Sequence, residues 1–351
     1  KHGVRQENRS MSRHSRLEEK ERKLIRKKIA NVQNRKRHKQ RIVMAKKPEI
    51  QKLMADKLYD IEHSLGMYAF SYCTIPAEGI YDKEALEPLM EVVETCHIYL
   101  IGLTPVIDFV DAVQKNDLLI LKYKIAGQDY SLTFELPDRF NLKSDGDLLY
   151  VEGPDGQRSW PDDNYIQSRL STETNAVDFE VKYIGQAYGK DGSRNAVDRL
   201  LKHETLQKIA LKGVPEGYRL SLLLLAIQPN NQLFTMMNPF AKNTDEGPER
   251  IRAGLDKLFN TTEQERITLY EASLIRYFYP EFNKEFKDSF PSTNLKVLQD
   301  CYEKDFSGVA AEICIDELPF KLFSDSVEPK NYHIAKHDLH KDDSRRMFFG
   351  L

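Results

Sequence analysis

The chain has 351 residues, enough for two or three domains, and its 40% apolar and 30% charged residues are typical of a polar globular protein. No stretch approaches 18 uninterrupted apolar residues, which excludes an evident membrane-spanning helix. The formal net charge of -2 is made of two opposed parts. Residues 1–50 carry 18 Lys and Arg against 5 Asp and Glu, whereas the remainder carries 34 against 49.

The four cysteines are widely spaced and form no Cys-x-x-Cys pair. This pattern disfavours a zinc ribbon or a disulfide scaffold, and it favours a reducing, cytoplasmic setting.

Residues 1–64 are predicted to form a basic helical arm. Sparse apolar residues follow a helical spacing within a heavily charged segment, and a basic block falls at 35–41. A block of this kind binds phosphate backbones, so its candidate nucleic-acid contacts are Arg35, Lys36, Arg37, Lys39 and Arg41. The alternative is a solvated helix that packs on the acidic body, on a second copy or on a partner protein.

Residues 65–160 are predicted to form a small α/β accessory or recognition module. Strand-like runs occur at 67–72 and 148–151, helical spacing occurs at 83–95, and 118–136 has the pattern of a β-hairpin around a glycine turn. No catalytic constellation is evident in this module, and its expected role is to select or hold a substrate.

The segment from Phe179 to Ile209 carries the first candidate site. Alternation predicts a strand that ends in Tyr183-Ile184-Gly185, followed by a polar loop and an amphipathic helix. Arg199 and His203 are four residues apart and are therefore expected to share one face of that helix.

Two further elements follow. Leu220 to Ile227 is a nearly continuous apolar run, which predicts a strand buried in the middle of a sheet. A helix is predicted after Thr262, with an apolar stripe that contains one carboxylate, Glu271. Because an unpaired buried carboxylate costs several kcal/mol, Glu271 is expected to be paired, hydrogen-bonded or metal-bound. The purely structural alternative is that Glu271 lies at the edge of the apolar stripe and forms an ion pair with Arg199 or Arg276.

Two motifs in this order resemble the GIY-YIG nuclease core. One is Tyr183-Ile184-Gly185 followed by Arg199-Leu200-x-x-His203, and the other is Glu271 with Leu274-Ile275, Pro280 and Asn283. The resemblance covers residues 161–290 and implies an α+β fold: a small nuclease core with a three-stranded central sheet and flanking helices, joined to the arm, the 65–160 module and a C-terminal extension at 291–351. The tripeptide Gly79-Ile80-Tyr81 is far from this region in the chain and is interpreted as a coincidence.

The family also has a first tyrosine, on a strand hairpinned to the Tyr-Ile-Gly strand. The best candidate here is Tyr165, in a predicted strand at 164–170. The Gly-Ile-Tyr signature itself is absent at this position, so the first motif diverges from the family.

The resemblance implies phosphodiester hydrolysis that depends on Mg²⁺ or Mn²⁺. Glu271 would hold the metal, Arg199 would share the phosphate charge, and Tyr183 with Tyr165 would orient or deprotonate water. His203 is a candidate for proton transfer, Asn283 for bracing the site, and Arg194 is the rival of Arg199. The implied protein is a cytoplasmic DNA endonuclease, with restriction of foreign phage DNA as a possible role by analogy. The alternative is a non-catalytic nucleic-acid-binding or assembly protein that retains the fold.

Overall fold

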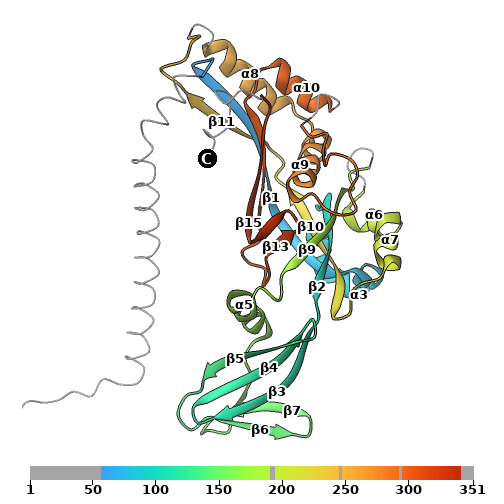
Figure 1. Cartoon of the computed structure of the whole chain (residues 1–351), viewed down its shortest axis with the longest axis vertical. Coiled ribbons are helices and arrows are strands. Elements are labelled where there is room, and N and C mark those ends of the chain that lie inside the picture. Colours follow the sequence, from blue (N-terminus) through green and yellow to red (C-terminus); the bar gives the residue numbers. More distant parts are fainter. Residues whose placement is uncertain (1–56, 190–193, 245–246, 292–294, 341–351) are drawn as a thin grey trace, which may run out of the picture.

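The structure is a computed structural model that describes residues 57–189, 194–244, 247–291 and 295–340. One nine-stranded mixed sheet dominates it (Figure 1), with the strand order β14-β13-β9-β2-β10-β1-β12-β15 and with β11 also paired to β1. Its strands are β1 (Ile61–Pro76), β2 (Ile98–Pro105), β9 (Phe179–Gln186), β10 (Tyr218–Ile227), β11 (Gln232–Met237), β12 (Gly308–Cys314), β13 (Leu322–Ser324), β14 (Val327–Lys330) and β15 (Tyr332–Asp338).

The prediction of a small three-stranded core sheet was wrong. The long strand β1 extends the sheet because it changes partners at a bulge between Ala69 and Ser71. Before the bulge β1 pairs with β11 and β12, and after it β1 pairs with β10. Strands β1 and β2, from the predicted 65–160 module, therefore lie in the same sheet as β9 and β10 from the predicted 161–290 domain.

The buried central strand predicted at 220–227 is confirmed. Strand β10 lies between β2 and β1, and its residues from Leu222 to Ala226 are completely buried. A strand with both faces covered can be a continuous apolar run, which is why no alternation marks it in the sequence.

Helices cover both faces of the sheet (Figure 1). One face packs against α9 (Glu263–Phe278) and α10 (Lys296–Glu303). The other face packs against α6 (Ala196–Leu200), α7 (Glu204–Lys212) and the short helical turns η1 (Ala77–Tyr81), α3 (Lys83–Leu86), η2 (Glu87–Leu89) and α4 (Met90–Val93). Helix α8 (Gly247–Asn260) lies beside β1 and β11 at the end of the sheet. Among the described residues, no helix is long and apolar enough to cross a membrane.

Residues 106–178 form a separate lobe with its own hydrophobic core, inserted between β2 and β9 (Figure 1). It contains the sheets β3 (Ile107–Lys115), β4 (Leu118–Ile125), β5 (Gln128–Glu135) and β6 (Asn141–Asp145), β7 (Leu148–Glu152), β8 (Arg158–Ser159), together with α5 (Asp163–Glu173). The predicted hairpin is confirmed as β4 and β5, joined at Ala126 and Gly127, both with positive φ.

The strand predicted at 164–170 was wrong, because this segment lies in helix α5. The Asp162 side chain caps the helix by accepting a hydrogen bond from the Tyr165 backbone N–H. Ile166 and Leu170, four residues apart, are buried on one face of the helix, and the Tyr165 side chain is half exposed.

Candidate functional site

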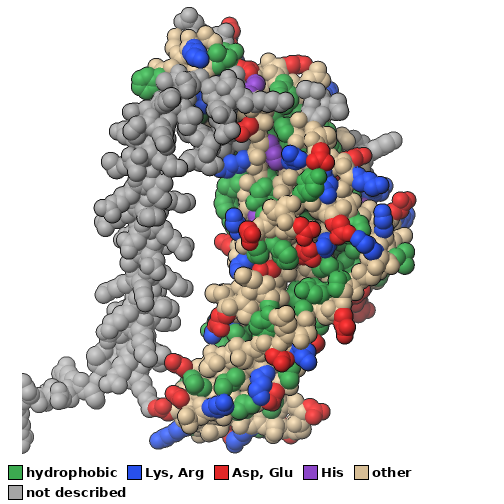
Figure 2. Space-filling model, in the orientation of Figure 1, with side chains coloured by type: hydrophobic (Ala, Val, Ile, Leu, Met, Phe, Trp, Pro, Cys, Tyr) green, Lys and Arg blue, Asp and Glu red, His purple; other side chains and the backbone are tan. Residues whose placement is uncertain are grey.

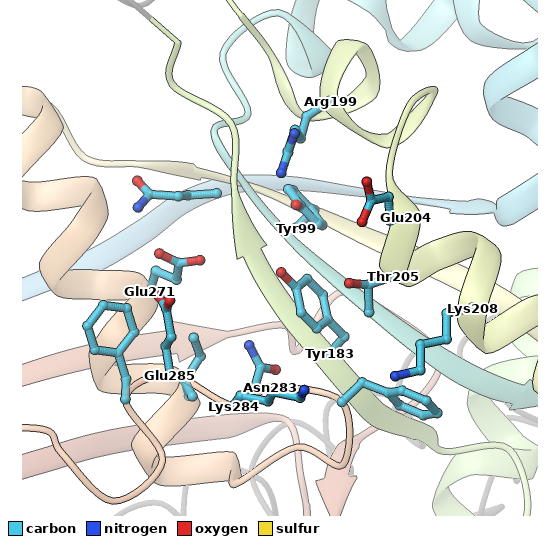
Figure 3. Close-up of a pocket in the computed structure, with 14 residues that line it drawn as sticks. Tyr99, Tyr183, Arg199, Glu204, Thr205, Lys208, Glu271, Asn283, Lys284 and Glu285 are labelled. Atoms are coloured by element: carbon cyan, nitrogen blue, oxygen red, sulfur yellow. The ribbon is translucent and has the colours of Figure 1, made fainter.

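A cleft of about 510 Å³ opens over β9, between α6 and α7 on one side and α9 with the loop after it on the other (Figure 3). Its lining is polar and comes from five separate segments of the chain. The residues are Tyr99, Tyr183, Gln186, Arg199, Glu204, Thr205, Lys208, Glu271, Ile275, Phe282, Asn283, Lys284, Glu285 and Phe286.

Two tyrosines from neighbouring antiparallel strands lie together in this cleft. Tyr99, near the start of β2, is the register partner of Gly185 on β9, and its ring centre lies 6.2 Å from that of Tyr183. A Cβ atom at position 185 would lie only 2.5 Å from the Tyr99 hydroxyl oxygen. Gly185 is therefore required because the Tyr99 ring occupies the space of its missing side chain.

His203 forms a buried hydrogen bond with the Tyr99 hydroxyl. The His203 Nε2 atom lies 2.9 Å from the Tyr99 hydroxyl oxygen, and its Nδ1 accepts the Leu206 backbone N–H at 3.2 Å. Because Nδ1 is an acceptor, the neutral ring carries its proton on Nε2 and donates it to Tyr99. Burial, reinforced by the charge of Arg199, lowers the pKa of His203 to about 4, so the ring is neutral at pH 7.

Arg199 and His203 do not share one helix as predicted. Arg199 lies in α6, which ends at Leu200, whereas His203 is the N-cap residue of α7. The side chain of His203 is used to accept a backbone hydrogen bond, which breaks the helix between the two residues. Arg199 lines the cleft beside Tyr99 (Figure 3).

Glu271 is confirmed as a buried carboxylate in the apolar stripe of α9, with 8% of its surface exposed. Helix α9 begins after Thr262, whose side chain forms a capping box with Glu265. Burial raises the pKa of Glu271 to about 8, and the charge of Glu285 adds to the effect. Hydrogen bonds from Gln186 and the positive charge of Arg199 oppose it.

The donor set around Glu271 fits a hard divalent cation. A cation beside Glu271 and Glu285 would offset both the desolvation and the mutual repulsion of the two carboxylates. Within the described ranges there is no group of three or more His, Cys, Asp and Glu side chains that could enclose a metal. Mg²⁺ and Mn²⁺ commonly bind through one or two carboxylates and keep water or phosphate oxygens as further ligands, so Glu271 and Glu285 are the residues that would hold such an ion.

Asn283 fixes the loop after α9 to the edge of the site. Its side chain accepts the Ile184 backbone N–H at 2.9 Å and donates to the Ile184 carbonyl at 2.8 Å. A further bond from the Phe282 backbone N–H to the Lys182 carbonyl, at 3.0 Å, holds the same loop. The loop carries Lys284 and Glu285 into the cleft (Figure 3).

Some of the predicted site residues line the cleft, and others lie away from it. Tyr183, Arg199, Glu271 and Asn283 line one cleft, and His203 contacts it through Tyr99. Tyr165 lies in the lobe, where its ring packs on Phe134, and Arg194 is not among the residues that line the cleft. The predicted nucleic-acid contacts at Arg35, Lys36, Arg37, Lys39 and Arg41 lie outside the described residues.

Sequence reasoning missed Tyr99, Lys208, Lys284 and Glu285. The available signal for Tyr99 was the apolar run from Ile98 to Leu103, which has strand length and contains a glycine at 102. Gly102 lies against Phe179 of β9, where a Cβ atom would be 2.1 Å from the aromatic ring. No motif or spacing in the sequence distinguishes Lys208 and Lys284 from the other lysines of the chain.

The tripeptide Gly79-Ile80-Tyr81 lies in the helical turn η1, away from the residues that line the cleft, and the Tyr81 side chain is 67% exposed.

The chain was also compared with known proteins. No family model, no curated protein and no solved structure matches it.

Proposed function

We propose that this chain is a divalent-metal-dependent endonuclease of the GIY-YIG kind that hydrolyses phosphodiester bonds in DNA. The observation that carries the proposal is that Tyr99, Tyr183, Arg199 and Glu271, from four different strands and helices, line one polar cleft. Each is a residue type that phosphodiester hydrolysis needs: hydroxyls to orient water, a cation for phosphate and a carboxylate for metal.

The resemblance to the family is supported by the register of β2 and β9. The Tyr-Ile-Gly strand pairs antiparallel with a strand that carries another tyrosine, Tyr99, in the sequence His97-Ile98-Tyr99. In this proposal Tyr99 takes the role that the sequence interpretation gave to Tyr165. Asn283 braces the site through its paired hydrogen bonds to Ile184.

Arg199 binds a phosphate oxygen of the scissile group and stabilises the negative charge that grows there during attack. Lys208 and Lys284 line the same cleft and bind neighbouring phosphates of the strand. When bound at Glu271, Mg²⁺ or Mn²⁺ would supply Lewis-acid charge on the phosphate and the leaving oxygen.

Tyr183 orients the attacking water from the floor of the cleft. Burial and the charge of Glu271 raise the pKa of Tyr183, whereas Arg199 and a hydrogen bond with Tyr99 oppose this shift. His203 donates to Tyr99, so the hydroxyl proton of Tyr99 is directed away from His203 and toward the cleft. The polar chain from His203 through Tyr99 thus fixes the hydroxyl that faces the water.

We place this activity in a reducing compartment such as the cytoplasm, because all four cysteines are unpaired. Restriction of foreign DNA is one role that such an endonuclease could have. The 106–178 lobe carries 7 Lys and Arg against 14 Asp and Glu, and this excess of negative charge disfavours its contact with the DNA backbone. On the face shown in Figure 2, basic and acidic side chains are interspersed over this lobe.

The test is cleavage of plasmid DNA with Mg²⁺ or Mn²⁺. Glu271→Ala and Tyr99→Phe are each expected to reduce the rate about 100-fold or more, as loss of a charge-stabilising or proton-orienting group does. Tyr165→Phe is the matched control, because its ring lies in the lobe, and it should keep the wild-type rate. A wild-type protein as inert as Glu271→Ala on DNA and RNA would refute the proposal and favour the non-catalytic alternative.

A further inference from the structure

Helix α8 buries its polar face and exposes its apolar face, which is the reverse of an ordinary amphipathic surface helix. The residues it buries are Gly247, Arg250, Gly254 and Lys257. Its apolar residues Ile251, Leu255 and Phe259 are 44%, 42% and 77% exposed. A surface helix usually turns its apolar stripe toward the core, so this orientation needs a physical explanation.

The polar face of α8 is held on β1 and on the segment that contains α10 by specific contacts. Arg250 donates from Nε to the Ile61 carbonyl at 2.6 Å and pairs with Asp305 at 3.3 Å. Lys257 pairs with Asp300 at 2.7 Å and donates to the Val297 carbonyl at 3.1 Å. These bonds satisfy both buried cations, so the helix cannot rotate its apolar stripe inward without leaving them unpaired.

The stripe of α8 is defined by Ile251, Leu255, Leu258 and Phe259, at i, i+4, i+7 and i+8. This spacing forms one continuous face about 12 Å long at 1.5 Å per residue. Three of its four side chains are exposed and the fourth, Leu258, is partly exposed. An exposed apolar face of this regularity is typical of a docking site for another helix or an apolar segment.

The undescribed part of the chain joins the body beside the first turn of α8. The Tyr59 ring lies under the Arg250 guanidinium at 3.8 Å, and a Cβ atom at Gly247 would lie 2.9 Å from the Asp60 carboxylate. The Asn243 backbone N–H, at 2.8 Å from the Leu58 carbonyl, holds the same segment. Residues immediately before Lys57 therefore start beside the first turn of α8, next to Gly247 and Arg250 and about one turn or less from Ile251, the first residue of the stripe (Figure 1 shows α8 at this end of the sheet).

The sequence just before Lys57 has a matching apolar pattern. Ile50, Leu53 and Met54 occur at i, i+3 and i+4, after Pro48. Ile50 is seven residues from Lys57, a reach of up to about 25 Å in extended chain, which exceeds the length of the stripe. This segment lies outside the described residues.

We propose that the α8 stripe is the docking site for the chain's own segment Ile50–Met54. Docking there fixes the direction in which the basic residues at 35–41 leave the body. It also places the root of the arm on the helix that leads, through Thr262, into the helix that carries Glu271. The inference does not depend on the nuclease activity, because it concerns how the arm is anchored.

A cysteine pair tests this contact directly in the full chain. Leu53→Cys combined with Leu255→Cys should form a disulfide within one chain under a mild oxidant, identified by mass spectrometry of the digested protein. The matched control is Leu53→Cys with Leu211→Cys, since Leu211 is an 88% exposed leucine on α7. The docked pair should cross-link about tenfold faster or more, because docking raises the local concentration of one thiol at the other.

Hydrogen exchange gives a second measure that needs no new cysteine. Amides of residues 49–56 should exchange about tenfold more slowly in the wild type than in Phe259→Asp, and Leu211→Asp should leave them unchanged. Because Phe259→Asp could unfold α8, Leu53→Asp is measured as well and should release the same amides with the body intact. Equal cross-linking of both cysteine pairs, or no protection in the wild type, overturns the proposal. A cross-link only between two chains, with a dimeric mass that Phe259→Asp abolishes, also overturns it and shows that a second copy covers α8.

Discussion

Replacing Glu271 by glutamine should stabilise the metal-free protein, and the gain should grow with pH. Because the folded pKa of Glu271 is about 8 and the ordinary value is 4.5, the folded state holds its proton more tightly than the unfolded state. The stability that the protonated carboxyl contributes is therefore complete below pH 4.5 and is lost as the pH rises through 8. Glutamine has no such proton to lose.

The size of the effect follows from the two pKa values. At about 1.4 kcal/mol for each pH unit between them, the upper limit is about 5 kcal/mol above pH 8, and about 3 kcal/mol at pH 7. The Glu271 side chain is more than nine-tenths buried, so screening by solvent removes little of this energy.

The assay is urea unfolding of both proteins in chelator between pH 5 and pH 9. The two unfolding free energies should coincide near pH 5 and separate toward pH 9, with Glu271→Gln the more stable. Addition of Mg²⁺ or Mn²⁺ should stabilise the wild type by binding its folded state and should leave Glu271→Gln unchanged. A difference that does not vary with pH, or a less stable glutamine variant at pH 8, would refute the reasoning.

Three other predictions test the surroundings of the site. Asn283→Ala leaves two buried backbone groups of β9 unpaired and should lower the unfolding free energy by about 2–5 kcal/mol in urea titrations. Asn260 is exposed, so the control variant Asn260→Ala should change the unfolding free energy by less than about 0.5 kcal/mol. His337 on β15 is buried with its Nε2 atom 3.0 Å from the Ser273 carbonyl of α9, and burial lowers its pKa to about 4. The stability that the neutral ring contributes is therefore complete above pH 6.5 and falls by up to about 3 kcal/mol as the pH drops to 4, so His337→Gln should flatten the pH dependence of the thermal melting temperature over this range; an unchanged pH profile would show that His337 is not neutral and buried as described. Lys208→Glu should reduce the salt dependence of DNA binding by about one phosphate contact in fluorescence anisotropy, and Lys122→Glu, in the acidic lobe, should not; equal slopes would move the DNA path away from the cleft.

Helix α9 and the strands β9 and β10 could be predicted because their evidence is local. The capping box at Thr262, the apolar stripe and the misplaced carboxylate of Glu271 all lie within one helix. The same holds for the alternation that ends at Gly185 and for the apolar run of β10. These patterns depend on neighbouring residues and on the burial of one face, which the sequence contains directly.

The prediction of one helix containing Arg199 and His203 was wrong for a reason that is also local. Its spacing fits a continuous helix, but the His203 imidazole accepts a backbone hydrogen bond and starts a new one. Histidine is not among the common N-cap residues, so its capping role was not evident. The error at Tyr165 was different, because Asp162, Ile166 and Leu170 carry a helix pattern that was overlooked in favour of a strand needed to complete the motif.

The pairing of β2 with β9 could not be predicted from spacing, although it determines the site. The two antiparallel strands are separated in the chain by the lobe at 106–178, which has its own core. Because the entropy of loop closure grows only with the logarithm of loop length, and because the lobe has its own packed core, such an insertion costs the pairing of β2 with β9 little. The register sets Tyr99 opposite Gly185, and it is maintained by close packing between the strands. Within this strand pair, Gly102 against the Phe179 ring and Gly185 against Tyr99 are positions where a larger side chain does not fit. A search for this site in a sequence should therefore look for a second glycine-containing apolar strand at any distance, with a tyrosine three residues before its glycine.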